Sequence, residues 1–124
     1  AIEAAKDWYE QAIAALRSKN NIIYLASDLI NLGRVSLLLG DSAAAHSSFS
    51  EGLQVARECG RVDMIARAYA SLAQLAYDLQ QLPLAQTNAR QALDLFRRLG
   101  MQRDADAAER LLASIGAALE AARG

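Results

Sequence analysis

The sequence predicts an all-α fold in which about six antiparallel helices stack side by side as a solenoid, and three observations support this prediction. Hydrophobic residues make up 53% of the chain and aromatic residues only 6%, so the apolar mass is mostly alanine and leucine, which favour helix. Apolar residues recur at helical spacing, without the sustained alternation of a β-strand. Similar residues also return every 40 positions, which indicates a repeat architecture.

The 40-residue period divides the chain into a half-repeat (1–20), two full repeats (21–60 and 61–100) and a closing half-repeat (101–124). We expect one domain, because 124 residues is the size of one ordinary domain. The recurring residues are Gly60 and Gly100; Leu53, Val55 and Arg57 with Leu93, Leu95 and Arg97; Leu32, Leu72 and Leu112; Ala45 and Ala85; and Ala5, Ile13 and Arg17 with Ala45, Leu53 and Arg57.

Each full repeat is predicted to hold two helices, and residues with known preferences mark their boundaries. Gly40 and Gly60 end helices, because glycine tolerates the left-handed backbone that closes them. Asp41 or Ser42 caps the next helix. Pro83 suits a first helical turn, where its missing N–H would have no partner anyway. The predicted helices span residues 2–18, 21–39, 42–59, 62–80, 83–99 and 102–122.

The balance of charge argues against nucleic acid and against an anionic membrane as ligands. The chain has 13 basic and 14 acidic residues and a net charge of −1. No apolar run approaches the roughly 18 residues of a membrane span, and the N-terminus resembles no signal peptide. The single cysteine, Cys59, cannot form an internal disulfide, which favours a reducing compartment. We therefore expect a cytoplasmic protein.

The chain lacks the clustered residues that catalysis or metal binding needs. It has one histidine, His46, and one cysteine, Cys59, and its acidic residues do not gather at a diagnostic spacing. Its glycines lie singly and do not follow a strand, so no phosphate-binding loop is expected. We predict no enzyme activity, no metal and no cofactor.

Both full repeats resemble the tetratricopeptide repeat, in which small residues occupy the helix crossings and large residues fill the space beside them. The pattern is matched by Leu29, Leu32, Gly33, Ala45, Phe49 and Gly52 in one repeat and by Tyr69, Leu72, Ala73, Ala85 and Ala92 in the other. The step of 40 exceeds the usual period of about 34. It is similar to the longer repeats of kinesin light chains, of Leu-Gly-Asn polarity adaptors and of sensor regions in bacterial transcriptional activators. HEAT-like helix pairs are the alternative fold.

The resemblance implies that the chain binds a protein or peptide as part of a larger regulatory protein. Eleven arginines against two lysines favour a bacterial source, and a start at Ala1 within a helical pattern suggests a fragment. Two alternatives remain open. The chain could form a homo-oligomer through its exposed repeat ends, or it could supply a wall to an active site whose catalytic residues lie in another domain.

The resemblance also implies where a partner binds, because the first helix of each pair lines the inner wall of the superhelix. The wall positions fall on Ser27, Ile30, Asn31, Arg34, Leu37 and Leu38, on Arg67, Ala70, Gln74, Tyr77 and Asp78, and on Arg110 and Ser114. Ile30, Leu37 and Leu38 form a second apolar stripe on a helix whose first stripe already faces the core. They contact either neighbouring repeats or a partner.

The three wall arginines, Arg34, Arg67 and Arg110, have two interpretations. They could bind a carboxylate of a partner through forked hydrogen bonds. Alternatively they pair with acidic residues of the same wall, namely Asp28, Asp78 and Asp106. Chaperone-adaptor repeats hold an acidic peptide terminus with Lys and Asn at set positions. Asn31 and Arg67 fall on two of those positions, but Arg34 and Ser71 depart from the pattern, so we do not expect that clamp.

Trp8 lies on the predicted helix 2–18, at the flank or at the open end, because other residues of that helix face the next pair. It is either buried in the ordinary way or marks a surface where a further helix or a second copy docks.

Overall fold

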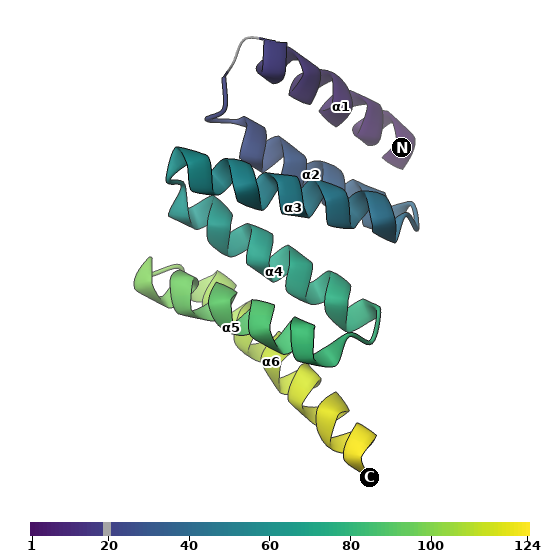
Figure 1. Cartoon of the computed structure of the whole chain (residues 1–124), viewed down its shortest axis with the longest axis vertical. Coiled ribbons are helices and arrows are strands. Elements are labelled where there is room, and N and C mark those ends of the chain that lie inside the picture. Colours follow the sequence, from purple (N-terminus) through teal and green to yellow (C-terminus); the bar gives the residue numbers. More distant parts are fainter. Residues whose placement is uncertain (19–20) are drawn as a thin grey trace.

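The helices follow one another in a single row, with α1 and α6 at opposite ends (Figure 1). The computed structural model describes residues 1–18 and 21–124, and within that range it contains helices and no strand. The helices are α1 (Ile2–Ser18), α2 (Leu25–Leu38), α3 (Ser42–Cys59), α4 (Val62–Asp78), α5 (Leu82–Arg98) and α6 (Gln102–Arg123).

The contacts between helices show an open stack. Each helix packs against the next one along the chain, and the further contacts among the described residues join α2 to α4 and α4 to α6. Helices α2, α4 and α6 therefore form one layer, and α1, α3 and α5 cover it from the other side. No contact in the described part of the chain closes the row by joining α1 to α5 or α6. The predicted all-α solenoid is confirmed, because a closed bundle would bring its first and last helices together.

The residue that turns the chain after a helix recurs every 20 residues. After α2, α3, α4 and α5 the chain turns through a residue with positive φ, at Gly40 (79°), Gly60 (68°), Gln80 (61°) and Gly100 (71°). The next N–H then donates to the carbonyl five residues earlier, as Asp41 does to Ser36 and Gln81 does to Ala76. These bonds satisfy carbonyls that have no partner within the helix. Because Gln80 takes the left-handed position, the helix predicted to end at residue 80 ends at Asp78.

The predicted caps are confirmed. The Asp41 side chain accepts a hydrogen bond from the Ala44 N–H at 3.0 Å and begins α3. Pro83 lies in the first turn of α5, which begins at Leu82, one residue before the predicted start. The predicted ends of the first and third helices match, and α6 runs one residue beyond its prediction.

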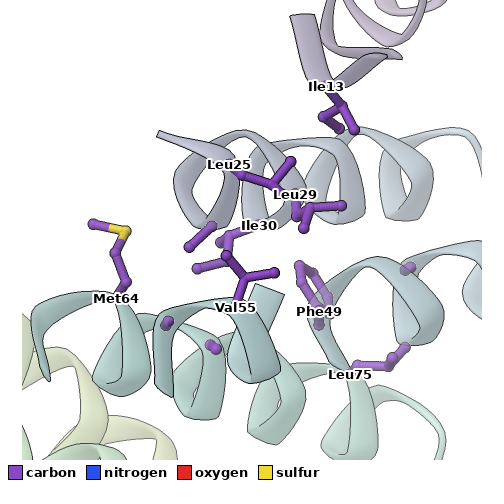
Figure 2. Close-up of a cluster of buried hydrophobic side chains, with 12 residues drawn as sticks. Ile13, Leu25, Leu29, Ile30, Phe49, Val55, Met64 and Leu75 are labelled. Atoms are coloured by element: carbon purple, nitrogen blue, oxygen red, sulfur yellow. The ribbon is translucent and has the colours of Figure 1, made fainter. Parts of the chain in front are cut away.

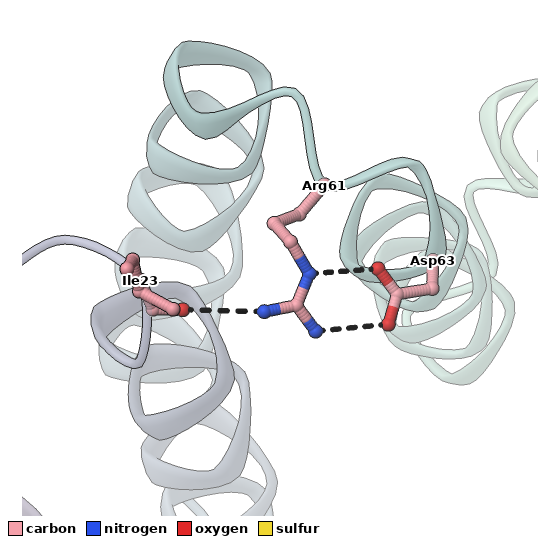
Figure 3. Close-up of polar contacts among 3 residues, drawn as sticks. All are labelled: Ile23, Arg61 and Asp63. Carbon is pink, nitrogen blue, oxygen red and sulfur yellow. Dashed lines mark hydrogen bonds and ion pairs between the residues drawn. The ribbon is translucent and has the colours of Figure 1, made fainter.

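The start of α2 was predicted wrongly, since the helix begins at Leu25 and not at residue 21. Backbone carbonyls that precede this helix are contacted by side chains from the α3–α4 region. The Cys59 thiol donates to the Ile22 carbonyl at 3.2 Å, and the Arg61 guanidinium approaches the Ile23 carbonyl at 3.5 Å. Figure 3 shows that the same guanidinium forms a fork with the Asp63 carboxylate, at 3.1 and 3.0 Å. These contacts tie the α1–α2 connection to the α3–α4 connection.

The first half of the row shares one core. Figure 2 shows large apolar side chains of α1 to α4 directed toward one another between the helices. At its centre, Phe49 is fully buried and lies against Gly33, where an added Cβ would come within 2.5 Å of the ring. The small residue of the repeat pattern thus lets α2 and α3 approach closely. Two further clusters join α4, α5 and α6: one contains Leu93 and Phe96, and the other is built around Ile115.

The recurring arginine links successive helices. Arg57 donates to the Tyr69 hydroxyl, and its guanidinium carbon lies 5.7 Å from the centre of the Tyr69 ring. Forty residues later, Arg97 pairs with Glu109 in the same register. Arg17 instead pairs with Glu51, because the equivalent position on α2 is an apolar leucine. The repeat therefore keeps the cation and changes its partner.

Candidate functional site

Two adjoining hollows form a groove along the layer of α2, α4 and α6. The first has a volume of about 300 Å³ and is lined by residues of all three helices together with Phe96 of α5. The second has a volume of about 510 Å³ and lies toward the C-terminal ends of α2 and α4. Arg34, Ala70, Ser71 and Gln74 line both hollows, so we treat them as one groove.

Most of the sequence-predicted wall residues lie together in this groove. Those lining it are Ser27, Ile30, Asn31, Arg34, Leu37, Leu38, Arg67, Ala70, Gln74 and Asp78. Three others, Tyr77, Arg110 and Ser114, do not line it. Tyr77 is half-buried against the cluster around Ile115, and the Ser114 hydroxyl donates to the Arg110 carbonyl at 3.2 Å.

Some groove residues were missed. Helix α6 contributes Asp104, Ala107, Ala108 and Leu111 in place of the two residues predicted there. The missed set also includes Met64, Ser71, Phe96 and Phe49. The 40-residue period carried a usable signal, because Met64, Arg67 and Ser71 fall on Asp104, Ala107 and Leu111 when 40 is added. Phe49 and Phe96 lie on second helices, and both are buried side chains that line the bottom of the groove.

The wall arginines do not pair within the wall, so that interpretation was wrong. Among residues 1–18 and 21–124, no carboxylate forms an ion pair with Arg34, Arg67 or Arg110. Asp78 accepts instead from the Gln74 amide at 2.9 Å. In the same way, Asp106 accepts a hydrogen bond from the Gln102 amide. The third acidic residue, Asp28, has its pKa raised by burial. The groove therefore presents two cations, Arg34 and Arg67, that form no ion pair with a carboxylate of the described residues.

The second apolar stripe divides between core and surface. Ile30 is 5% exposed and belongs to the core, where its Cγ1 lies 3.1 Å from the position of a Cβ added to Gly52. Leu37 is half-buried. Leu38 is 70% exposed at the edge of the second hollow. Contact with neighbouring repeats is therefore confirmed for Ile30, whereas Leu38 is left uncovered by the described residues.

Trp8 is not buried, so the expectation of ordinary burial was wrong. Its side chain is 61% exposed, and its ring forms a T-shaped pair with the ring of Tyr9, with centres 5.1 Å apart. The equivalent residue of α3, Ser48, is 9% exposed. The outer face of α1 therefore lacks the cover that α2 gives to α3.

The described residues contain no group of three or more His, Cys, Asp and Glu side chains arranged to hold a metal ion. None of the helices in the described part of the chain is both long enough and apolar enough to cross a membrane. His46 is exposed, and Cys59 is half-buried with its thiol bonded to the α1–α2 connection.

The fold and the groove together define a helical-repeat protein whose groove runs along α2, α4 and α6. No protein-family model matches the sequence, and no curated protein sequence matches it either. The fold is similar to that of a solved structure titled "Crystal structure of BtubC (BKLC) from P. vanneervenii", with a TM-score of 0.69 and 18% sequence identity. The alignment covers 96% of this chain and 58% of that one, so the chain spans little more than half of that protein's length. At this identity the likeness shows the fold alone.

Proposed function

We propose that this chain is a non-enzymatic interaction module of the tetratricopeptide type that binds a peptide or protein segment in the groove between α2, α4 and α6. In this proposal it is the sensor or scaffold part of a larger bacterial regulatory protein and works in the cytoplasm. The sequence pattern and the 40-residue helical pairs support the family assignment, and the fold likeness agrees with it.

One observation carries the proposal: the groove combines uncovered apolar surface with cations that form no ion pair within the described part of the chain. Leu38 is 70% exposed beside Leu37, and Arg34 and Arg67 line the same groove. Apolar side chains surrounded by a few polar groups are typical of surfaces that become buried on binding. The polar residues of the groove, such as Asn31 and Gln74, can hydrogen-bond a peptide backbone.

The test is a selection of binders from a phage-displayed library of random dodecapeptides against the immobilised protein. Peptides selected on the wild-type protein should lose binding to Leu38→Glu and to Arg34→Glu, because each change places an acidic group in the groove. Leu84→Glu on α5 is the matched control, since Leu84 is 50% exposed and lies outside the groove. Circular dichroism verifies that the variants fold. Selected peptides that bind folded groove variants undiminished would reject this face.

Self-assembly is a second candidate, favoured by the exposed Trp8. Helix α1 buries only Ile13, whereas α3 buries six residues, so the outer face of α1 offers a surface of the kind that another helix covers in the rest of the row. Sedimentation over a wide concentration range should show a rising mass that Trp8→Ser abolishes. A strict monomer at every concentration excludes this candidate.

A further inference from the structure

A third hollow lies away from the groove, where α1, α2 and α3 meet. It has a volume of about 330 Å³, and we call it the outer hollow. Its lining includes Ile13, Ala14 and Arg17 of α1, Leu29 of α2, and Ser47 and Glu51 of α3. None of these residues lines the groove between α2, α4 and α6. The outer hollow is therefore a separate site, on the side of α2 that α1 and α3 cover.

The repeat gives a reason for this hollow. Adding 40 to Arg17 and Leu29 gives Arg57 and Tyr69, so the corresponding place between α3, α4 and α5 has a tyrosine where the first repeat has a leucine. The Tyr69 side chain packs against the apolar cluster that contains Phe96, and its hydroxyl accepts a hydrogen bond from Arg57. Leucine is shorter than tyrosine by the outer part of the ring and the hydroxyl group. In the register of the repeat, the outer hollow takes the place of that part.

The lining of the outer hollow suits an aromatic ring that carries a hydroxyl group. Ile13 points from α1 toward α2, where Leu29 lies, and the two supply apolar contact for a ring (Figure 2). In the second repeat the guanidinium carbon of Arg57 lies 5.7 Å from the centre of the Tyr69 ring, within the range of a cation–π contact. Arg17 is the equivalent cation here. Its bond to Glu51 uses one Nη atom, and a guanidinium has five N–H donors, so donors remain for a second acceptor.

The charges around the outer hollow favour a neutral hydroxyl over an ion. Glu10 and Glu51 both line it, and both are exposed. A ligand carboxylate would meet these two like charges, and a ligand ammonium would meet Arg17. A phenol is neutral at neutral pH, because its pKa is about 10. Its oxygen can accept from the guanidinium while its O–H donates to a carboxylate, so the hydroxyl finds both of its partners.

From these observations we propose that the outer hollow binds a phenol group, with the ring against Leu29 and the hydroxyl between Arg17 and Glu51. The ligand supplies to the first repeat the group that Tyr69 supplies to the second. A free small phenol and the tyrosine side chain of a partner share this chemistry, and the experiment distinguishes them. This inference goes beyond the proposed function, because the groove takes no part in it.

The probe is p-cresol, the side-chain analogue of tyrosine, titrated into the isotope-labelled protein and followed by two-dimensional NMR at neutral pH. We expect the amide signals of Ala14, Ser47 and Glu51 to shift. Toluene lacks the hydroxyl group, and p-toluate carries a carboxylate in its place. Each should bind at least about tenfold more weakly than p-cresol, as for loss of a hydrogen bond to a charged group.

Three variants locate the site. Arg17→Met keeps an aliphatic stem without the guanidinium, so p-cresol should bind about tenfold more weakly and toluene should bind unchanged. Arg57→Met is the matched control, because it removes the equivalent arginine of the second repeat; p-cresol should bind the outer hollow of this variant unchanged. Tyr69→Leu recreates the leucine of the first repeat and should open a second p-cresol site beside Arg57. Circular dichroism verifies that the variants fold.

N-acetyl-L-tyrosinamide distinguishes the two sources of the phenol. Binding as tight as that of p-cresol assigns the site to a partner's tyrosine, and loss of binding assigns it to a free phenol; each result retains the phenol group. Three results would overturn the inference. They are shifts in Tyr69→Leu beside Arg57 with none at the outer hollow, toluene or p-toluate binding as tightly as p-cresol, and p-cresol shifts confined to the groove.

Discussion

The close approach of α2 and α3 at Gly33 gives the sharpest test of the fold. A Cβ added at Gly33 would lie 2.5 and 2.6 Å from two ring carbons of Phe49, and the ring is fully buried. Contacts this short do not persist, so Gly33→Ala must displace the ring or separate the helices. Overpacking of this kind costs about 1–3 kcal/mol. The gain in helix propensity offsets about 0.5–1 kcal/mol, and we expect a net loss of about 1–2 kcal/mol in the free energy of unfolding.

Gly116 supplies the matched control, because it lies inside α6 and an added Cβ meets nothing within 4 Å. Gly116→Ala should therefore stabilise the protein by about 0.5–1 kcal/mol. Urea unfolding followed by circular dichroism measures both variants at unchanged slope. In the double variant Gly33→Ala/Phe49→Leu, the smaller side chain should recover at least about 1 kcal/mol relative to the sum of the single changes. If Gly33→Ala stabilised the protein as much as Gly116→Ala, the close crossing would be refuted.

The remaining predictions concern the helix end after α4, one ion pair and the tryptophan. Gln80→Gly should raise the free energy of unfolding by about 0.5–1 kcal/mol, because Gln80 carries a φ of 61° that glycine adopts without strain; an unchanged urea midpoint would contradict this. The hydrogen bond and charge of Arg61 hold the pKa of Asp63 below its usual range, so Asp63 adds stability that is present above its unfolded pKa and is lost as the pH falls through the folded pKa. In Arg61→Gln, an NMR titration should show the pKa of Asp63 raised, and an unmoved titration would show that the fork has no influence. The single Trp8 should emit like an indole in water and be quenched by iodide in dilute solution, whereas blue-shifted, protected emission would mean that its outer face is covered.

The candidate site was predictable to the extent that the repeat fixed the direction of each side chain. The resemblance to the tetratricopeptide repeat placed Ser27, Arg34 and Arg67 on one wall, and they line one groove. It failed for Tyr77, which packs around Ile115, and for Arg110, whose carbonyl accepts from the Ser114 hydroxyl. Which cations remain unpaired was also out of reach. Gln74, not an arginine, holds Asp78, and that choice depends on side-chain geometry within a solvated wall.

The sequence by itself determined the helices, their order and their stacking, because small residues at the crossings and glycine or proline at the ends act locally and recur with the repeat. The tertiary structure alone decided where α2 begins and how the exposed stripe divides. Cys59 and Arg61, which lie more than 30 residues away along the chain, hold the carbonyls before α2. Ile30 entered the core and Leu38 stayed in water, because burial depends on what a neighbouring helix covers, and periodicity records only the face on which a residue lies.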